Sequence, residues 1–166
     1  MDRREAPLYS EASAARAHLA EALPPVIGHR GAAASAPENT LAGLRKASEL
    51  GCRWVEFDVR LTADRHLILL HDDRIERTTD GRGNAAALPL VALRRHDAGT
   101  WWSRGFSSER IPTLAEAVML LGQLGVRVAV ANVAGAVAQD DHDLVNATIT
   151  QVVDATLDHG LVSEGK

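Results

Sequence analysis

The spacing of hydrophobic residues along this chain alternates between the two-residue period of a strand and the roughly 3.6-residue period of a helix. Residues 53–60 alternate apolar and acidic side chains, which predicts a strand, and the apolar run at 26–28 predicts another before it. Between them, apolar residues recur at helical spacing over 37–50, and Gly51 provides a C-terminal stop. The pattern over 26–60 therefore predicts a strand, a helix and a second strand.

Four further elements are predicted in the same way. In chain order they are a strand at 66–70 after a turn at 62–65, a helix at 113–124, a strand at 126–131 and a helix at 140–159. Thr113 and Glu116 form a capping-box pattern at the start of the helix at 113–124. A further strand could begin at 161–162.

Two stretches fall outside this alternation. Residues 1–25 form a polar lead-in, with a short helix expected at 13–23 before a pair of prolines. Residues 74–110 are rich in Gly, Arg and Thr and have weak periodicity, so we expect an excursion with one helical turn near 90–95. Residues 26–166, which include this excursion, are expected to form the domain.

The order of the predicted elements indicates the fold class. Strands that alternate with helices favour parallel pairing and an α/β fold. About four strand-helix units are visible, and the pattern stops in the middle of a cycle. We therefore expect a partial α/β sheet.

Composition narrows the function classes. The chain has 166 residues, which suits one domain, and its single cysteine, Cys52, excludes a disulfide framework and a cysteine-built zinc site. A formal net charge of −4 and 4% aromatic residues argue against duplex and single-stranded nucleic acids as partners. No apolar run reaches the roughly 18 residues of a membrane span, and no apolar segment follows the charged N-terminus, so we expect a cytoplasmic protein.

Two carboxylates on the predicted strand at 53–60 are candidate metal ligands. Glu56 and Asp58 are two positions apart, so they lie on one face with about 6.6 Å between them. Both could reach one hard cation such as Ca²⁺ or Mg²⁺. The alternative is a solvated face of an edge strand.

Three other candidates follow predicted strands. His29 and His71 stand where α/β folds place their chemistry, and imidazoles can give and take protons near neutral pH. Arg30, beside His29, could bind a phosphate with two parallel hydrogen bonds. Each of the three could equally be a structural or solvated side chain.

Several short motifs occur in one order along the chain. They are Ile27-Gly28-His29-Arg30-Gly31, Ala36-Pro37-Glu38-Asn39-Thr40, Glu56-Phe57-Asp58-Val59, Leu70-His71-Asp72, Arg77-Thr78-Thr79-Asp80-Gly81-Arg82-Gly83, Asp97-Ala98-Gly99-Thr100-Trp101 and Ile111-Pro112-Thr113-Leu114. Together they resemble the glycerophosphodiester phosphodiesterase family, densely over 26–124 and more loosely to about 160.

The resemblance implies a fold and an activity. It implies a TIM-type barrel with a small insertion after the third strand, at about 74–110, and a hydrolase of glycerol and lipid metabolism. That enzyme cleaves a small-molecule glycerophosphodiester to glycerol 3-phosphate and an alcohol with the help of Ca²⁺ or Mg²⁺. The same resemblance assigns acid–base catalysis to His29 and His71. It assigns phosphate binding to Arg30 and metal binding to Glu56 and Asp58. Glu38 is expected to contact the site's arginine or the metal surroundings.

Two departures from the family pattern leave a second hypothesis open. The family's Glu-x-Lys on the fourth strand aligns with Ala131 and Val133, and Asn132 points to the other face unless the register shifts. A full barrel needs roughly 200–250 residues, so we expect a homodimer that completes the barrel, a truncated chain or a chain that folds poorly. The alternative function is a catalytically inactive remnant or a phosphate- or metal-binding module. The sequence leaves the alcohol, the metal and the oligomeric state open.

Overall fold

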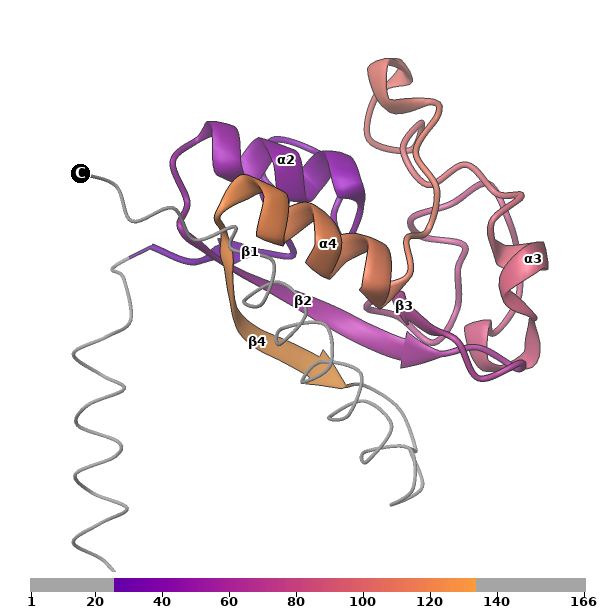
Figure 1. The fold of residues 1–166 in the computed structure, drawn as a ribbon. Helices are drawn as coiled ribbons and strands as arrows, with labels where there is room; N and C mark the ends of the chain where they lie inside the picture. Colours follow the sequence, from indigo (N-terminus) through magenta and orange to yellow (C-terminus); the bar gives the residue numbers. More distant parts are fainter. Residues whose placement is uncertain (1–25, 134–166) are drawn as a thin grey trace, which may run out of the picture.

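Residues 26–133 are described by the computed structural model, and their backbone forms one four-stranded sheet (Figure 1). The strands are β1 (Gly28–His29), β2 (Trp54–Leu61), β3 (Leu67–Leu69) and β4 (Arg127–Val133). The central strand is β2, which pairs in parallel with β1 and with β4. The α/β prediction is confirmed, and the parallel order β1-β2-β4 is that of a partial barrel.

The pairing of β2 with β3 corrects the expectation of parallel strands. Val59 lies opposite Leu69 in an antiparallel register, so these two strands form a hairpin. The connection at 62–65 is too short for the crossover that parallel strands require. Thr62 closes this turn, because its hydroxyl oxygen accepts from the backbone N–H of His66 at 2.9 Å.

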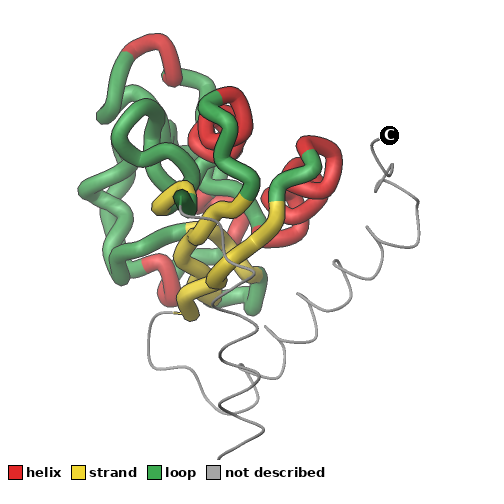
Figure 2. Tube along the Cα trace, turned by 90° about the vertical axis from the view of Figure 1, so that its left-hand side faces the viewer, coloured by secondary structure: helices red, strands yellow, loops and turns green. Residues whose placement is uncertain are grey.

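Two helices cover one face of the sheet, α2 (Leu41–Glu49) and α4 (Leu114–Leu124), as Figure 2 shows from the side. The capping box at the start of α4 is present, and Gly125 ends that helix with a φ of 65°. The other helix, α2, begins later than predicted, because Thr40 is its N-cap and Asn39 has a φ of 53°. A residue with left-handed backbone cannot continue a helix, so 37–40 form a loop.

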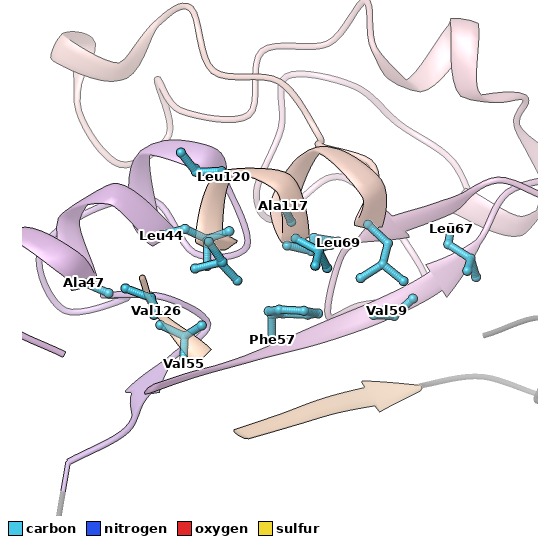
Figure 3. Packing of buried hydrophobic residues seen from close by; sticks show 13 residues of the cluster. Leu44, Ala47, Val55, Phe57, Val59, Leu67, Leu69, Ala117, Leu120 and Val126 are labelled. Atoms are coloured by element: carbon cyan, nitrogen blue, oxygen red, sulfur yellow. The ribbon is translucent and has the colours of Figure 1, made fainter. Parts of the chain in front are cut away.

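The main core lies between β2 and these helices. Val55, Phe57 and Val59 are fully buried or nearly so and point toward α2 and α4 (Figure 3). The acidic positions between them therefore lie on the opposite face of the strand, as the alternation predicted.

The segment 74–110 folds beside the end of β3 and carries only short elements. These are η1 (Ala85–Ala87), α3 (Leu90–Leu93) and η2 (Arg104–Phe106). A second buried cluster joins this segment to the sheet: Ile68 and Leu70 pack in it, whereas Leu67 and Leu69 belong to the main core. Alternate residues of the stretch 67–70 thus pack in two different hydrophobic clusters.

Some predictions fall outside the described residues. They are the lead-in with its helix at 13–23, the helix at 140–159 and the strand at 161–162. The domain boundary at residue 26 therefore stays a prediction. Among residues 26–133, each helix is too short or too polar to cross a membrane.

Candidate active site

The first loop leaves β1 through a tight turn that presents His29 and Arg30. Arg30 has a φ of 50° and Gly31 a φ of 84°. A Cβ on Gly31 would lie 2.7 Å from the backbone carbon of Gly43, so this turn packs directly on α2. The side chain of His29 is 69% exposed, and its Nε2 lies 3.9 Å from Glu56 Oε2.

The two carboxylates of β2 face this turn. Glu56 Oε2 accepts a hydrogen bond from the backbone N–H of Arg30 at 3.0 Å. The side chain of Asp58 is only 2% exposed, and Asp58 Oδ2 accepts from Asn39 Nδ2 at 3.0 Å. Arg30 Nε lies 3.2 Å from the same oxygen, which gives the buried carboxylate a cationic neighbour.

Glu38 joins two arginines. Its Oε1 accepts from Arg30 Nη1 at 2.9 Å and from Arg77 Nη2 at 2.7 Å, and its Oε2 accepts from Arg77 Nη1 at 2.9 Å. Burial raises the pKa of Glu38, but the hydrogen bonds and charges of Arg77 and Arg30 outweigh it, so the pKa is lowered overall. The expected contact between Glu38 and the site's arginine is present.

His71 follows β3 and is held at two points. Its ring Nδ1 lies 2.6 Å from Asp72 Oδ1, and its backbone carbonyl accepts from Arg60 Nε at 2.9 Å. Arg77 donates to both oxygens of Asp72, at 2.6 Å and 3.2 Å. The hydrogen bond from Arg77 is the main reason that the pKa of Asp72 falls to about 2, so Asp72 is a carboxylate at neutral pH.

These contacts join all five residues that the sequence singled out. The path from one histidine to the other runs through His29, Glu56, Arg30, Glu38, Arg77, Asp72 and His71, with Asp58 attached at Arg30. Glu38 and His71 also line one small hollow, together with Thr78. The first loop and the loop after β3 therefore meet at one place.

Sequence reasoning missed three of the residues that hold this arrangement: Asn39, Asp72 and Arg77. Each lies inside a quoted motif, and Asp72 is next to His71, which is a signal that could have been used. Their partners lie elsewhere in the chain, and only the fold brings them together.

The pairing of β4 with β2 changes the expectation for the fourth strand. The register shifts between Val55 and Glu56, so that Asp58 pairs with Asn132 and Phe57 pairs with Ala131. Residues that are opposite each other in a parallel pair share a face of the sheet. By register, position 132 therefore belongs to the face of Glu56 and Asp58, and position 131 to the face of the main core.

Glu56 and Asp58 have the donor chemistry for a hard divalent cation. Both are carboxylates on one face of β2, and oxygen ligands of this kind suit Ca²⁺ and Mg²⁺. Within the described part of the chain, no three His, Cys, Asp or Glu side chains gather closely enough to hold a metal ion. The described residues thus offer two protein carboxylates for such an ion.

Comparison with known proteins identifies relatives of this chain. Residues 29–162 match the model of the glycerophosphoryl diester phosphodiesterase family. Glycerophosphodiester phosphodiesterase from Caldanaerobacter subterraneus is 44% identical over 97 residues, which are 58% of this chain and 40% of the relative. Human glycerophosphodiester phosphodiesterase 1 is 43% identical over 94 residues, 55% of this chain and 28% of the relative.

Solved structures agree with the sequence matches. A phosphodiesterase from Oleispira antarctica, in complex with the product sn-glycerol-3-phosphate, has a TM-score of 0.73 and 38% identity, covering 82% of this chain and 54% of the other. A glycerophosphodiester phosphodiesterase from Agrobacterium tumefaciens has a TM-score of 0.67 and 28% identity, covering 78% and 54%. The chain thus spans about half the length of these structures and less of the curated relatives.

Proposed function

This chain belongs to the glycerophosphoryl diester phosphodiesterase family, and we propose that its site hydrolyses glycerophosphodiesters to glycerol 3-phosphate and an alcohol. The observation that carries the proposal is the unbroken path of contacts between His29 and His71, with Arg30 in the middle. The product bound to the Oleispira antarctica relative supports a glycerol phosphate as the ligand class.

The two histidines are assigned to proton transfer. One imidazole takes a proton from the attacking water as the water oxygen bonds to phosphorus. The other imidazole gives a proton to the oxygen of the leaving alcohol as the bond between that oxygen and phosphorus breaks. His29 is exposed beside Glu56, and His71 is held at Nδ1 by Asp72, which leaves Nε2 for the substrate.

Arg30 is assigned to the phosphate. Its Nε is buried and has no hydrogen-bond acceptor among the described residues, although it lies close to Asp58. A buried donor without an acceptor is costly, and a phosphate oxygen would satisfy it. Glu38 fixes the other side of the guanidinium through Nη1.

Glu56 and Asp58 are assigned to a divalent cation, Ca²⁺ or Mg²⁺. When bound, such an ion neutralises phosphate charge. The buried position of Asp58 and its bond from Asn39 keep that carboxylate in one orientation. Two carboxylates make a weaker calcium site than three, because affinity depends on the number of charged ligands.

The second candidate function is phosphate or metal binding without turnover. It is favoured by Ala131 and Val133, where the family pattern has an acid and a lysine. It predicts that glycerol 3-phosphate binds and that no diester is cleaved.

One assay separates the two functions. Release of glycerol 3-phosphate from glycerophosphocholine is measured with Ca²⁺, with Mg²⁺ and with a chelator. We expect metal-dependent release that is lost in His29→Ala and His71→Ala and retained in His66→Ala, a half-exposed histidine that pairs with Asp64 instead. Absence of release from a folded sample that still binds glycerol 3-phosphate would support the second function.

The homodimer that would complete the barrel also stays a prediction. Sedimentation of the chain at several concentrations, with and without glycerol 3-phosphate, measures its oligomeric state directly.

A further inference from the structure

The segment 74–110 contributes one side chain to the contacts between the two histidines, that of Arg77. Its guanidinium donates four hydrogen bonds to two carboxylates, two to Asp72 and two to Glu38. Planar double contacts of this kind fix the geometry of both partners. Arg77 therefore connects the loop after β1 with the loop after β3.

The contact with Asp72 bears on the chemistry of His71. A carboxylate can only accept hydrogen bonds, so the 2.6 Å contact requires that Nδ1 of His71 carries the proton. The Nε2 atom of the neutral ring is then the proton acceptor. The backbone carbonyl of His71 is held separately by Arg60, which leaves ring orientation and tautomer to Asp72.

We propose that Arg77 is a positioning residue that keeps His71 in the Nδ1–H tautomer by clamping the carboxylate of Asp72. Without Arg77, Asp72 loses both of its guanidinium contacts and can rotate away from the ring. The catalytic consequence rests on the proposed function, whereas the tautomer does not depend on turnover.

Nitrogen NMR of the histidine ring tests the proposal. The full chain is labelled with ¹⁵N-histidine and measured at pH 8.5, where a histidine ring is ordinarily neutral. His71 is assigned by the signal lost in His71→Ala. We expect Nδ1–H in the wild type and a mixture with Nε2–H in Arg77→Gln. Arg77→Lys should give an intermediate mixture, since an ammonium group cannot make the planar double contact.

Two further variants control the measurement. Arg74→Gln removes an exposed arginine of the same segment that pairs with Glu76, and it should leave the His71 signals unchanged. Asp72→Ala removes the acceptor of the Nδ1–H altogether, and it should produce a mixture that contains the Nε2–H form even if Arg77→Gln folds poorly. Wild-type signals for His71 in Asp72→Ala, or in folded Arg77→Gln, would overturn the proposal.

Kinetics separate this proposal from the proposed function. With an active wild type, Arg77→Gln should lower kcat by about 10- to 100-fold, in the range found for partners that orient a ligand or a catalytic ring, with a smaller change in KM. A tautomer shift in an inactive chain would support the clamp and count against hydrolysis. An unchanged tautomer in an active chain would count against the clamp alone.

Discussion

Asn39 and Asp58 bind each other through two hydrogen bonds. Asn39 Nδ2 donates to Asp58 Oδ2 at 3.0 Å, and the backbone N–H of Asp58 donates to Asn39 Oδ1 at 3.2 Å. Both residues are buried, and Asn39 has a φ of 53°, which asparagine tolerates better than most residues. The loop after β1 is thereby fixed to the strand that carries the acidic residues.

Asn39→Ala should lower the free energy of unfolding by about 2–4 kcal/mol, because it removes both hydrogen bonds between two buried residues and puts alanine at a positive φ. Denaturant unfolding followed by circular dichroism measures the loss. Asn84→Ala is the control, since Asn84 is exposed, has a negative φ and caps only a short 3₁₀ turn. Its loss should be about 1 kcal/mol or less. Equal losses would contradict the role given to the buried pair.

Gly31→Ala should destabilise the chain much more than Gly51→Ala. Both glycines have a φ near 84°, so both variants carry the same backbone strain of about 1–2 kcal/mol. Only at Gly31 would the new Cβ meet the backbone of α2, whereas nothing lies within 4 Å at Gly51. Thermal unfolding compares the two. In an active chain, Gly31→Ala should also raise KM, because Arg30 must move with the turn. Similar melting temperatures for the two variants would show that the turn can shift without cost.

Acid should destabilise the folded chain over a defined pH window. The pKa of Asp72 falls from 3.8 to about 2, chiefly through the hydrogen bond from Arg77, so between these values the unfolded chain binds more protons than the folded one. The stabilisation is complete above about pH 4 and is lost as the pH falls to about 2. Unfolding free energies across this window should fall less steeply in Arg77→Gln than in the wild type. The control Arg82→Gln, an exposed arginine of the same segment, should keep the wild-type slope.

Position 132, and not 131, should accept a third metal-binding carboxylate. Asn132→Glu adds an acid opposite Asp58, so Ca²⁺ or Mg²⁺ affinity measured by calorimetry should rise by about tenfold or more. Ala131→Glu adds the acid opposite Phe57, on the core side, and should lower stability without raising affinity. Tighter metal binding in Ala131→Glu than in Asn132→Glu would contradict the register.

Local patterns in the sequence predicted the elements well. The alternation around Phe57 identified β2 and its acidic face, and Thr113 with Glu116 identified the start of α4. These features depend on neighbours within a few residues. The antiparallel pairing of β2 with β3 was missed, although the short turn between them was recognised.

Long-range relationships could not be obtained in that way. Arg77 and Glu38 are 39 positions apart, and neither residue type indicates the other. The register shift at Val55 and Glu56 depends on how two distant strands meet, so the face occupied by Asn132 was left open until the pairing was known. Candidate reactive residues were therefore visible in the motifs, but of the side chains that orient them only Glu38 was expected.

The alternation of residues 67–70 between two cores limits how this scaffold can be engineered. Ile68 and Leu70 find their apolar cover in the segment 74–110, and Arg77 comes from that same segment. Exchanging the segment for a loop from another protein, as a way to change substrate choice, would expose two aliphatic side chains and remove the clamp in one step. A graft that succeeds must bring its own hydrophobic cap and its own arginine, so the segment is not an interchangeable module.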